Sequence, residues 1–275
     1  MTTRALTFGS VAPLYERFRL GYPEDLVDVV LAFAERPIRT ALEIGAGTGK
    51  ATRAFAARGV AVTATDPDPE MLAQLRTHVP ASVVTVRASL EELPLTTAYD
   101  LVFVAAALHW TDPVHRWWRI AALVRPGGVF ASFGGQVQLT DPGVRERVHA
   151  ARSAFMADDA VPSPDGTPSD SAMQWPGTEL LDSEDFIDVR ERTLERRLTM
   201  SAADYVGHLS TVSAYLQLPA GARSDVLGRI RAVLPDEVAV TADLDLHLAR
   251  RADPRRLNSD VSSVSSDDAR NRGNI

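Results

Sequence analysis

A short glycine-rich segment carries the strongest chemical signal in the chain. Glu43 is followed by Gly45, Gly47 and Gly49, at a point where a predicted strand passes into a predicted helix. Glycine has no Cβ, so the backbone can turn tightly here and its N–H groups can approach a ligand closely. In folds that alternate strands and helices, such a turn binds nucleotides and related cofactors. The segment therefore predicts a cofactor-binding turn.

Two phosphate-binding patterns do not fit this turn. The dinucleotide pattern G-x-G-x-x-G requires a glycine where Lys50 stands. The phosphate loop G-x-x-x-x-G-K-[ST] requires a glycine at Ile44 and a hydroxyl at Ala51. A nicotinamide-dependent oxidoreductase therefore stays only as a less favoured alternative.

A second acidic residue follows the next predicted strand, residues 60–65. Asp66 lies 21 residues beyond Gly45, close to the spacing of about 20 expected for a carboxylate that hydrogen-bonds ribose hydroxyls. The alternative is that this aspartate, with Pro67 after it, only begins the next helix. The nearby glycine turn favours the ribose-binding interpretation.

Together these segments resemble the class I, Rossmann-like S-adenosylmethionine-dependent methyltransferases, of the small-molecule, natural-product type with a type 11-like domain. Residues 88–94, 99–103 and 124–128 are similar to further segments of that family, in the same order. The resemblance implies that S-adenosylmethionine is the cofactor and S-adenosylhomocysteine the product. It also implies methyl transfer to an O, N or C nucleophile of a small molecule, mainly by proximity and orientation. A non-catalytic module that binds the cofactor or its product is the alternative.

The resemblance also implies which residues bind the cofactor. Tyr15, Arg19 and Tyr22 resemble an N-terminal cover over the methionine end, with Arg19 as a carboxylate partner; a surface helix with aromatic anchors is the other interpretation. The full implied set is Tyr15, Arg19, Tyr22, Glu43, Gly45, Ala46, Gly47, Gly49, Asp66, Pro67, Ser89, Leu90, Glu91, Ala105 and Ala106.

His109 is the best-placed candidate for catalysis. It follows the predicted strand 100–105, at the sheet edge where open α/β sheets bind ligands, and a neutral imidazole can accept a proton at pH 7. A structural or pocket-wall role is the alternative, because positioning alone can accelerate methyl transfer. We expect the acceptor to contact His109, Trp110, Met173, Trp175 and Tyr215. The other histidines show no metal-ligand spacing, so no metal is expected.

Charge narrows the class of partner. The chain has 29 basic and 36 acidic residues, a net charge of −7, which disfavours nucleic acid. Residues 157–185 hold eight acidic residues and no basic one. If this stretch covers the acceptor, it favours an amine-bearing molecule; otherwise it is a solvated loop. The longest apolar run, residues 101–108, is too short to span a membrane, so a cytoplasmic protein without a membrane partner is expected.

The predicted fold class is α/β. We expect a doubly wound, seven-stranded, mostly parallel sheet, with its last strand antiparallel and a helical cover inserted after strand five. The expected units are residues 1–36 as N-terminal cover helices, 37–135 as the cofactor-binding core, 136–185 and 199–235 as the acceptor cover, 186–198 and 236–251 as the final strands of the core sheet, and 252–275 as a disordered tail.

Overall fold

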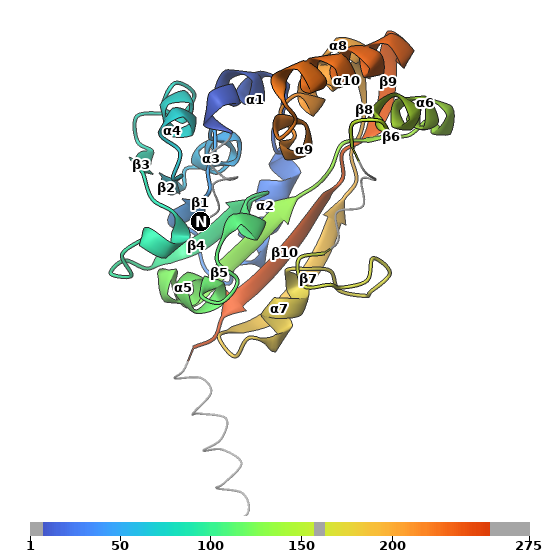
Figure 1. Cartoon of the computed structure of the whole chain (residues 1–275). Helices are drawn as coiled ribbons and strands as arrows, with labels where there is room; N and C mark the ends of the chain where they lie inside the picture. The colour runs from blue at the N-terminus through green and yellow to red at the C-terminus, as the bar shows by residue number, and fades with distance from the viewer. Residues whose placement is uncertain (1–7, 157–162, 254–275) are drawn as a thin grey trace, which may run out of the picture.

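The structure is a computed structural model that describes residues 8–156 and 163–253. Its main feature is a seven-stranded sheet in the order β3-β2-β1-β4-β5-β10-β7 (Figure 1). The strands are β1 (Thr40–Ile44), β2 (Ala61–Thr65), β3 (Val84–Val86), β4 (Tyr99–Ala105), β5 (Val124–Gly134), β7 (Phe186–Leu194) and β10 (Leu244–Arg251). The first five strands run parallel, and β10 is antiparallel to both β5 and β7. The predicted fold class is confirmed.

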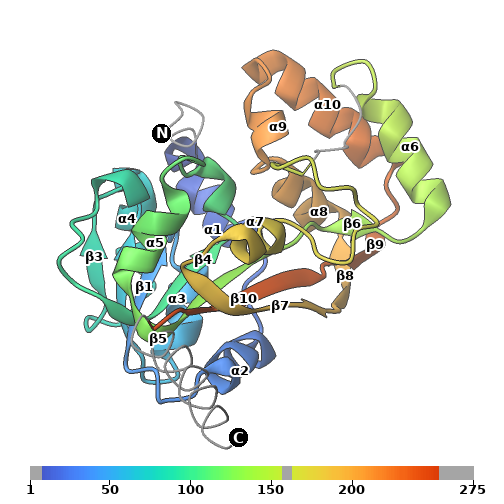
Figure 2. The ribbon, with the colours of Figure 1, turned by 90° about the horizontal axis from the view of Figure 1, so that it is seen from below.

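Helices cover both faces of this sheet because its central strands are apolar on both sides. Leu101 and Phe103 of β4 pack with α2 (Glu24–Phe33) and α3 (Lys50–Ala56), whereas Val102 and Val104 pack on the other face with α5 (Arg116–Leu123) and α7 (Gly177–Asp182). Figure 2 shows α2 on one side of the sheet and α5 and α7 on the other. The helix α4 (Pro69–Arg76) packs near the β2 end of the sheet.

A second layer sits beyond the carboxyl end of β5 and has its own core. It consists of a three-stranded sheet, β6-β9-β8, with helices packed against it (Figure 1). Its strands are β6 (Gln138–Leu139), β8 (Arg197–Ser201) and β9 (Glu237–Thr241), and its helices are α6 (Pro142–Arg152), α8 (Ala202–Leu209), α9 (Ser213–Leu216) and α10 (Ala220–Val233). The cover therefore contains a small sheet as well as helices, whereas only helices were expected.

Two predicted strands are divided between the two sheets, which corrects the expected boundaries. The alternating pattern over 236–251 continues through both β9 and β10, although the chain leaves one sheet and enters the other at Ala242 and Asp243. Likewise, the strand expected over 186–198 ends at Leu194, and the following residues begin β8 in the cover. An alternation of apolar and polar residues indicates that one face of a strand is buried, but it does not show which sheet the strand joins.

Two helices expected in covers belong to the core instead. Leu26 and Val30 of α2 pack against the main sheet, so only η2 (Gly9–Val11) and α1 (Ala12–Phe18) from the described part of residues 1–36 cover other elements. Leu180 of α7 is fully buried against the opposite face. Residues 254–275, most of the expected tail, lie outside the described residues. Within the described ranges, no helix is long and apolar enough to cross a membrane.

Candidate cofactor cleft and acceptor cavity

The three glycines after β1 have different structural roles. All three have positive φ, which favours glycine. A Cβ at Gly45 would lie 2.5 Å from Ala107, and one at Gly49 would lie 2.8 Å from Leu75. At Gly47 a Cβ would meet nothing within 4 Å, because this glycine faces the open cleft. Gly49 therefore allows the turn to pack on α4, and its expected contact with the cofactor stays a prediction.

Glu43 is a buried carboxyl group beneath this turn. It is 1% exposed and accepts a hydrogen bond from the hydroxyl of Thr52 on α3. Burial raises the pKa of Glu43 to about 8, and the nearby charge of Asp66 acts in the same direction. The side chain lines the cleft, so it offers a carboxyl group that can change its charge when a cation arrives.

Asp66 holds the glycine turn in place. Its carboxylate accepts the backbone N–H groups of Gly47 and Asp68, both at 2.9 Å. Burial raises the pKa of Asp66 to about 6, even though these two hydrogen bonds favour the charged form. Asp66 does not line the cleft, but each of its oxygens accepts only one of these bonds and has a further lone pair.

The N-terminal segment, residues 15–22, forms one wall of the cleft. The guanidinium of Arg19 donates to the side chain and the backbone carbonyl of Thr211 in the cover, both at 2.9 Å. The carboxylate of Glu16 pairs with Arg53 at 2.9 Å and with Lys50 at 3.5 Å. Burial raises the pKa of the Tyr15 phenol, so it stays neutral at physiological pH. The segment is thus fastened to both the core and the cover.

Nine of the expected cofactor residues surround one cleft of about 90 Å³. They are Tyr15, Arg19, Tyr22, Glu43, Gly45, Ala46, Gly47, Ala105 and Ala106. Arg196 and His208 also line this cleft and were not expected there. Arg196 lies between β7 and β8, and His208 lies within α8 of the cover; the sequence contains no recognisable motif at either position.

The segment after β3 is turned inward in this structure. Leu90 is fully buried in the core, and Ser89 begins the short helix η3 (Leu90–Glu92) in a capping box with Glu92. The carboxylate of Glu91 accepts the backbone N–H of Asp112 at 2.8 Å. None of these residues lines the cleft, and neither does Pro67, whose carbonyl accepts a bond from Arg87. Their expected cofactor contacts stay a prediction.

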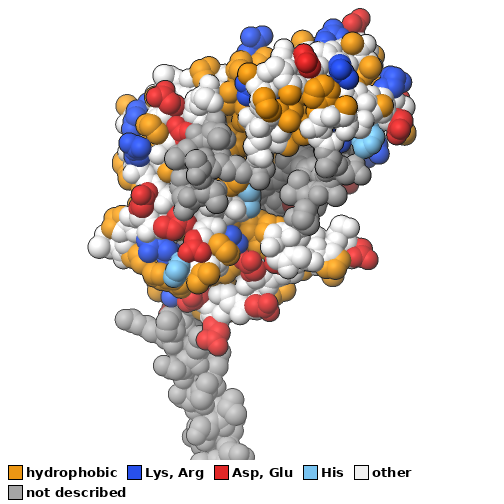
Figure 3. Space-filling view, in the orientation of Figure 1, with side chains coloured by type: hydrophobic (Ala, Val, Ile, Leu, Met, Phe, Trp, Pro, Cys, Tyr) orange, Lys and Arg blue, Asp and Glu red, His pale blue; other side chains and the backbone are white. Residues whose placement is uncertain are grey.

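A larger cavity of about 580 Å³ adjoins the cleft, with Ala106, Gly135 and Gln136 lining both. Ala106 has φ 55°, an unusual conformation for alanine, and such strain clusters at functional sites. His109 and Trp175 line this cavity, as expected for acceptor contacts. In Figure 3 a histidine side chain is visible in the hollow between the core and the cover.

Three polar residues of this cavity were missed by the sequence analysis. Asp243, Asp245 and His247 lie at or just before β10, on the face opposite Leu244 and Leu246, which pack in the core. Side chains alternate between faces in a strand. The sequence did contain a signal for these three residues: they alternate with apolar residues that pack in the core, so their side chains must face away from that core.

Three other expected acceptor residues do not line the cavity. Trp110 packs against His109 and Phe8, with ring centroids 4.4 Å and 6.1 Å away. The Met173 sulfur packs on Gly177 at the start of α7. Tyr215 is 2% exposed within the core of the cover. The Tyr215 ring packs within the core of the cover and so does not reach the cavity.

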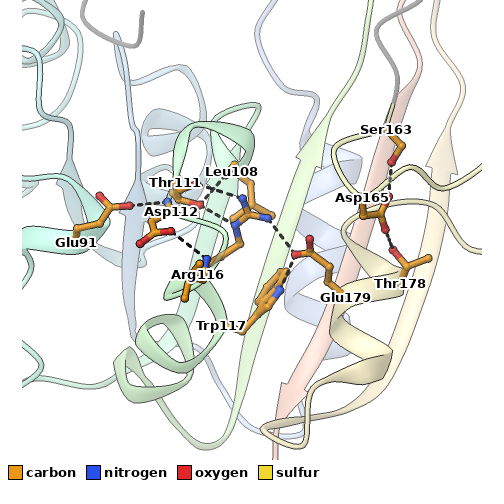
Figure 4. A network of polar contacts seen from close by, with 11 residues as sticks. Glu91, Leu108, Thr111, Asp112, Arg116, Trp117, Ser163, Asp165, Thr178 and Glu179 are labelled. Carbon is orange, nitrogen blue, oxygen red and sulfur yellow. Dashed lines mark hydrogen bonds and ion pairs between the residues drawn. The ribbon is translucent and has the colours of Figure 1, made fainter. Parts of the chain in front are cut away.

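A buried polar network fixes the wall of the cavity (Figure 4). Arg116 is 3% exposed and donates to both oxygens of Thr111, which follows the His109 helix η4 (Leu108–Trp110). It also pairs with Glu179 of α7 at 3.0 Å and lies 5.2 Å from the centroid of the Trp175 ring. Arg116 therefore joins the two cavity-lining segments that carry His109 and Trp175.

Within the part of the chain that the structure describes, no group of three or more His, Asp or Glu side chains is arranged to hold a metal ion. The site therefore consists of a narrow cleft on the glycine turn and a wide cavity beside it. The two meet at the carboxyl ends of β4 and β5, where ligands of open α/β sheets bind.

Part of the chain is similar to known methyltransferases. Residues 42–132 match the model of a methyltransferase domain family. Over 125 residues, the chain is 43% identical to uncharacterized methyltransferases of Mycobacterium bovis and Mycobacterium tuberculosis, covering 45% of this chain and 50% of those proteins. The chain thus spans about half the length of these curated relatives.

Solved structures extend the similarity to the whole fold. A candidate type II methyltransferase from Anaeromyxobacter dehalogenans is 25% identical with a TM-score of 0.61, covering 85% of this chain and 98% of that one. Phosphoethanolamine N-methyltransferase 2 from Haemonchus contortus, bound to S-adenosylhomocysteine and phosphomonomethylethanolamine, shares the fold at 16% identity and a TM-score of 0.51, covering 89% and 58%. The resemblance to class I methyltransferases is confirmed.

Proposed function

Because residues 42–132 match the model of a methyltransferase domain family, we propose that this chain methylates an O, N or C nucleophile of a small molecule with S-adenosylmethionine. The observation that carries the proposal is the meeting of two spaces at Ala106, Gly135 and Gln136. One space is lined by the glycine turn and the other is large enough for an acceptor. A module that only bound the cofactor would not need the second space.

The residues of the cleft fit this cofactor. Gly47 leaves open space where a side chain would stand, so its backbone can lie against a ligand. Arg19 and Arg196 place guanidinium groups at the cleft, which suit a carboxylate, while Glu43 suits an ammonium group. Asp66 retains acceptor capacity for hydroxyl groups. This donor set matches an amino acid joined to a nucleoside.

The cleft is small in the closed arrangement of the N-terminal segment. Its volume of about 90 Å³ is below the range of roughly 300–1,000 Å³ that is typical of ligand pockets. We infer that α1 moves outward to admit the cofactor, and that the ties of Glu16 and Arg19 close it again. Closure of this kind excludes water from the reacting atoms.

When bound, S-adenosylmethionine supplies a methyl group on a sulfonium: the nucleophile bonds to the methyl carbon while the carbon–sulfur bond breaks and sulfur keeps the electron pair. The chain's own residues orient the partners. Ala106 and Gly135 have small or no side chains where the two spaces meet, so the acceptor can approach closely. His109 faces the acceptor space and is positioned to take the proton of a hydroxyl or amine nucleophile.

Turnover tests this proposal against the binding-module alternative. Purified protein is incubated with S-adenosylmethionine and, one at a time, a panel of small phenols, amines and carboxylic acids, and S-adenosylhomocysteine release is measured. We expect release that depends on an acceptor. Binding of S-adenosylhomocysteine with no acceptor-dependent release across the panel would instead favour a module that only binds the cofactor.

A further inference from the structure

The acceptor cavity has a negatively charged wall. Asp243 and Asp245 both line it, and among the described residues the wall includes no lysine or arginine. Asp243 lies just before β10 and Asp245 near its start, and both face the cavity. Glu191, opposite His247 on β7, adds a third carboxylate next to this wall.

The two aspartates are not neutralised by the protein. One oxygen of Asp243 accepts the backbone N–H of Arg196 at 2.8 Å, and one oxygen of Asp245 accepts the hydroxyl of Thr193 at 2.8 Å. Among residues 8–156 and 163–253, neither carboxylate forms an ion pair with a basic side chain. No basic side chain is therefore paired with either carboxylate, and each has an oxygen that can accept a bond from a ligand in the cavity.

A buried histidine in the same wall is a second, independent sign of a ligand. His247 is 3% exposed, and its Nε2 atom makes no hydrogen bond, although an oxygen of Glu191 lies 3.4 Å away. Buried polar atoms are normally hydrogen-bonded. Burial also lowers the pKa of His247, so at neutral pH the ring adds no positive charge that could offset the aspartates.

From this wall we propose that the acceptor carries a protonated amine, which pairs with Asp243 and Asp245. This inference rests on the proposed methyltransferase function and names its substrate class. A cation is attracted to two unpaired carboxylates beside a low-dielectric wall, and an anion is repelled. An ammonium nitrogen has no lone pair, so the paired nitrogen anchors the acceptor while another atom, toward Ala106 and the cleft, receives the methyl group.

A pair of probes with similar shape and opposite charge tests the preference. With the protein saturated with S-adenosylhomocysteine, the binding of 2-phenylethylamine and of 3-phenylpropionate is measured by ligand-observed NMR at low salt. We expect the amine to bind about tenfold more tightly or better, and this difference to shrink as salt is added. Equal affinities, tighter binding of the carboxylate, or no binding of the amine would overturn the inference.

Charge-neutral variants locate the effect. Asp243→Asn with Asp245→Asn keeps oxygens that can accept the bonds from Arg196 and Thr193, so the fold is expected to persist. The double variant should lose about tenfold in amine affinity, which corresponds to about 1.4 kcal/mol. Asp225→Asn removes one negative charge from an exposed position on α10, which matches the charge change of Asp245→Asn alone, and it should leave amine affinity unchanged. An unchanged amine affinity in the double variant contradicts the proposal.

Two further readouts keep the outcomes separate. Asp245→Asn alone removes the more exposed carboxylate and should give part of the loss, which protects the test if the double variant misfolds. S-adenosylhomocysteine affinity is measured for each variant by calorimetry and should stay unchanged. Failure of every form to bind it would contradict the methyltransferase proposal itself, whereas normal cofactor binding without an amine preference would contradict only the substrate class.

Discussion

The cofactor cleft and the acceptor cavity are neighbours with opposite construction. The cleft is narrow and depends on a continuous turn between Glu43 and Gly49, which Asp66 fixes by accepting the backbone N–H of Gly47. The cavity is about six times larger by volume, 580 against 90 Å³, and combines positions from Ala106 to His247 whose polar groups are partly unpaired. A glycine turn therefore forms the floor of the first space, whose other walls come from the N-terminal segment and the cover, whereas the second space has no such turn.

The largest expected effect breaks the cleft at its turn. Gly47→Asp places a side chain and a negative charge in the cleft beside Glu43 and Asp66, and we expect S-adenosylhomocysteine affinity to fall by more than about 100-fold. Gly59→Asp is the matched control, because Gly59 also has positive φ and open space but lies outside the cleft. Calorimetric titration of both variants checks this; similar losses in the two would mean that backbone strain alone is responsible.

The difference between the two spaces explains what the sequence could predict. The glycine turn was found because a tight turn requires glycine, and Asp66 because it lies close to the spacing expected for a ribose-binding carboxylate. Spacing could not show that Gly49 also packs on α4, where Leu75 would lie 2.8 Å from a Cβ at this position. The fold class followed from the alternation of helical and strand segments along the chain, each recognised from the spacing of its apolar residues.

The acceptor cavity was less predictable for a physical reason. Trp175 was identified as a large apolar side chain in a polar stretch, yet Tyr215, chosen by resemblance, is buried in the cover. Asp243 and Asp245 come from a strand whose sheet could not be assigned, since the alternating pattern runs through both β9 and β10. The cavity is formed by contacts between elements that are distant in sequence, and such contacts produce no local sequence pattern from which they could be predicted.

A second prediction separates the two spaces through Arg116. Arg116→Met removes the buried guanidinium that joins Thr111, Glu179 and Trp175, and we expect it to lower the free energy of unfolding by about 2–3 kcal/mol. Urea denaturation measures this change. Arg190→Met, which removes an exposed arginine from a surface pair, should cost less than about 1 kcal/mol.

The binding consequences of Arg116→Met sharpen the comparison. The network fixes the wall of the acceptor cavity and touches no residue of the cleft, so the variant should keep its S-adenosylhomocysteine affinity while its binding of 2-phenylethylamine weakens. A folded variant that lost cofactor affinity instead would show that the two spaces are not independent.

A third prediction concerns pH and the buried carboxyl group of the cleft. Burial raises the pKa of Glu43 from 4.5 to about 8, so between these pH values the folded protein holds a proton that the unfolded chain has released. The free energy of unfolding should therefore fall as pH rises through this window. Glu43→Gln cannot ionise and should lose less stability; thermal unfolding of both forms from pH 5 to pH 9 measures this. Parallel curves would contradict the assigned burial effect.

The smallest expected effect is at His109. Because positioning supplies most of the acceleration of methyl transfer, we expect His109→Ala to lower turnover by about tenfold near pH 6.5. The loss should shrink at high pH, where the nucleophile loses its own proton. Rates of S-adenosylhomocysteine release between pH 6 and pH 9 give the profile. A loss of equal size at every pH would assign His109 to the cavity wall and not to proton transfer.

The central claim is that the cleft on the glycine turn binds S-adenosylmethionine, and calorimetric titration with S-adenosylhomocysteine tests it most directly. NADH is titrated in parallel as the ligand of the competing oxidoreductase interpretation. We predict micromolar or tighter binding of S-adenosylhomocysteine and no binding of NADH. Binding of NADH alone, or of neither ligand, would contradict the assignment of the cleft.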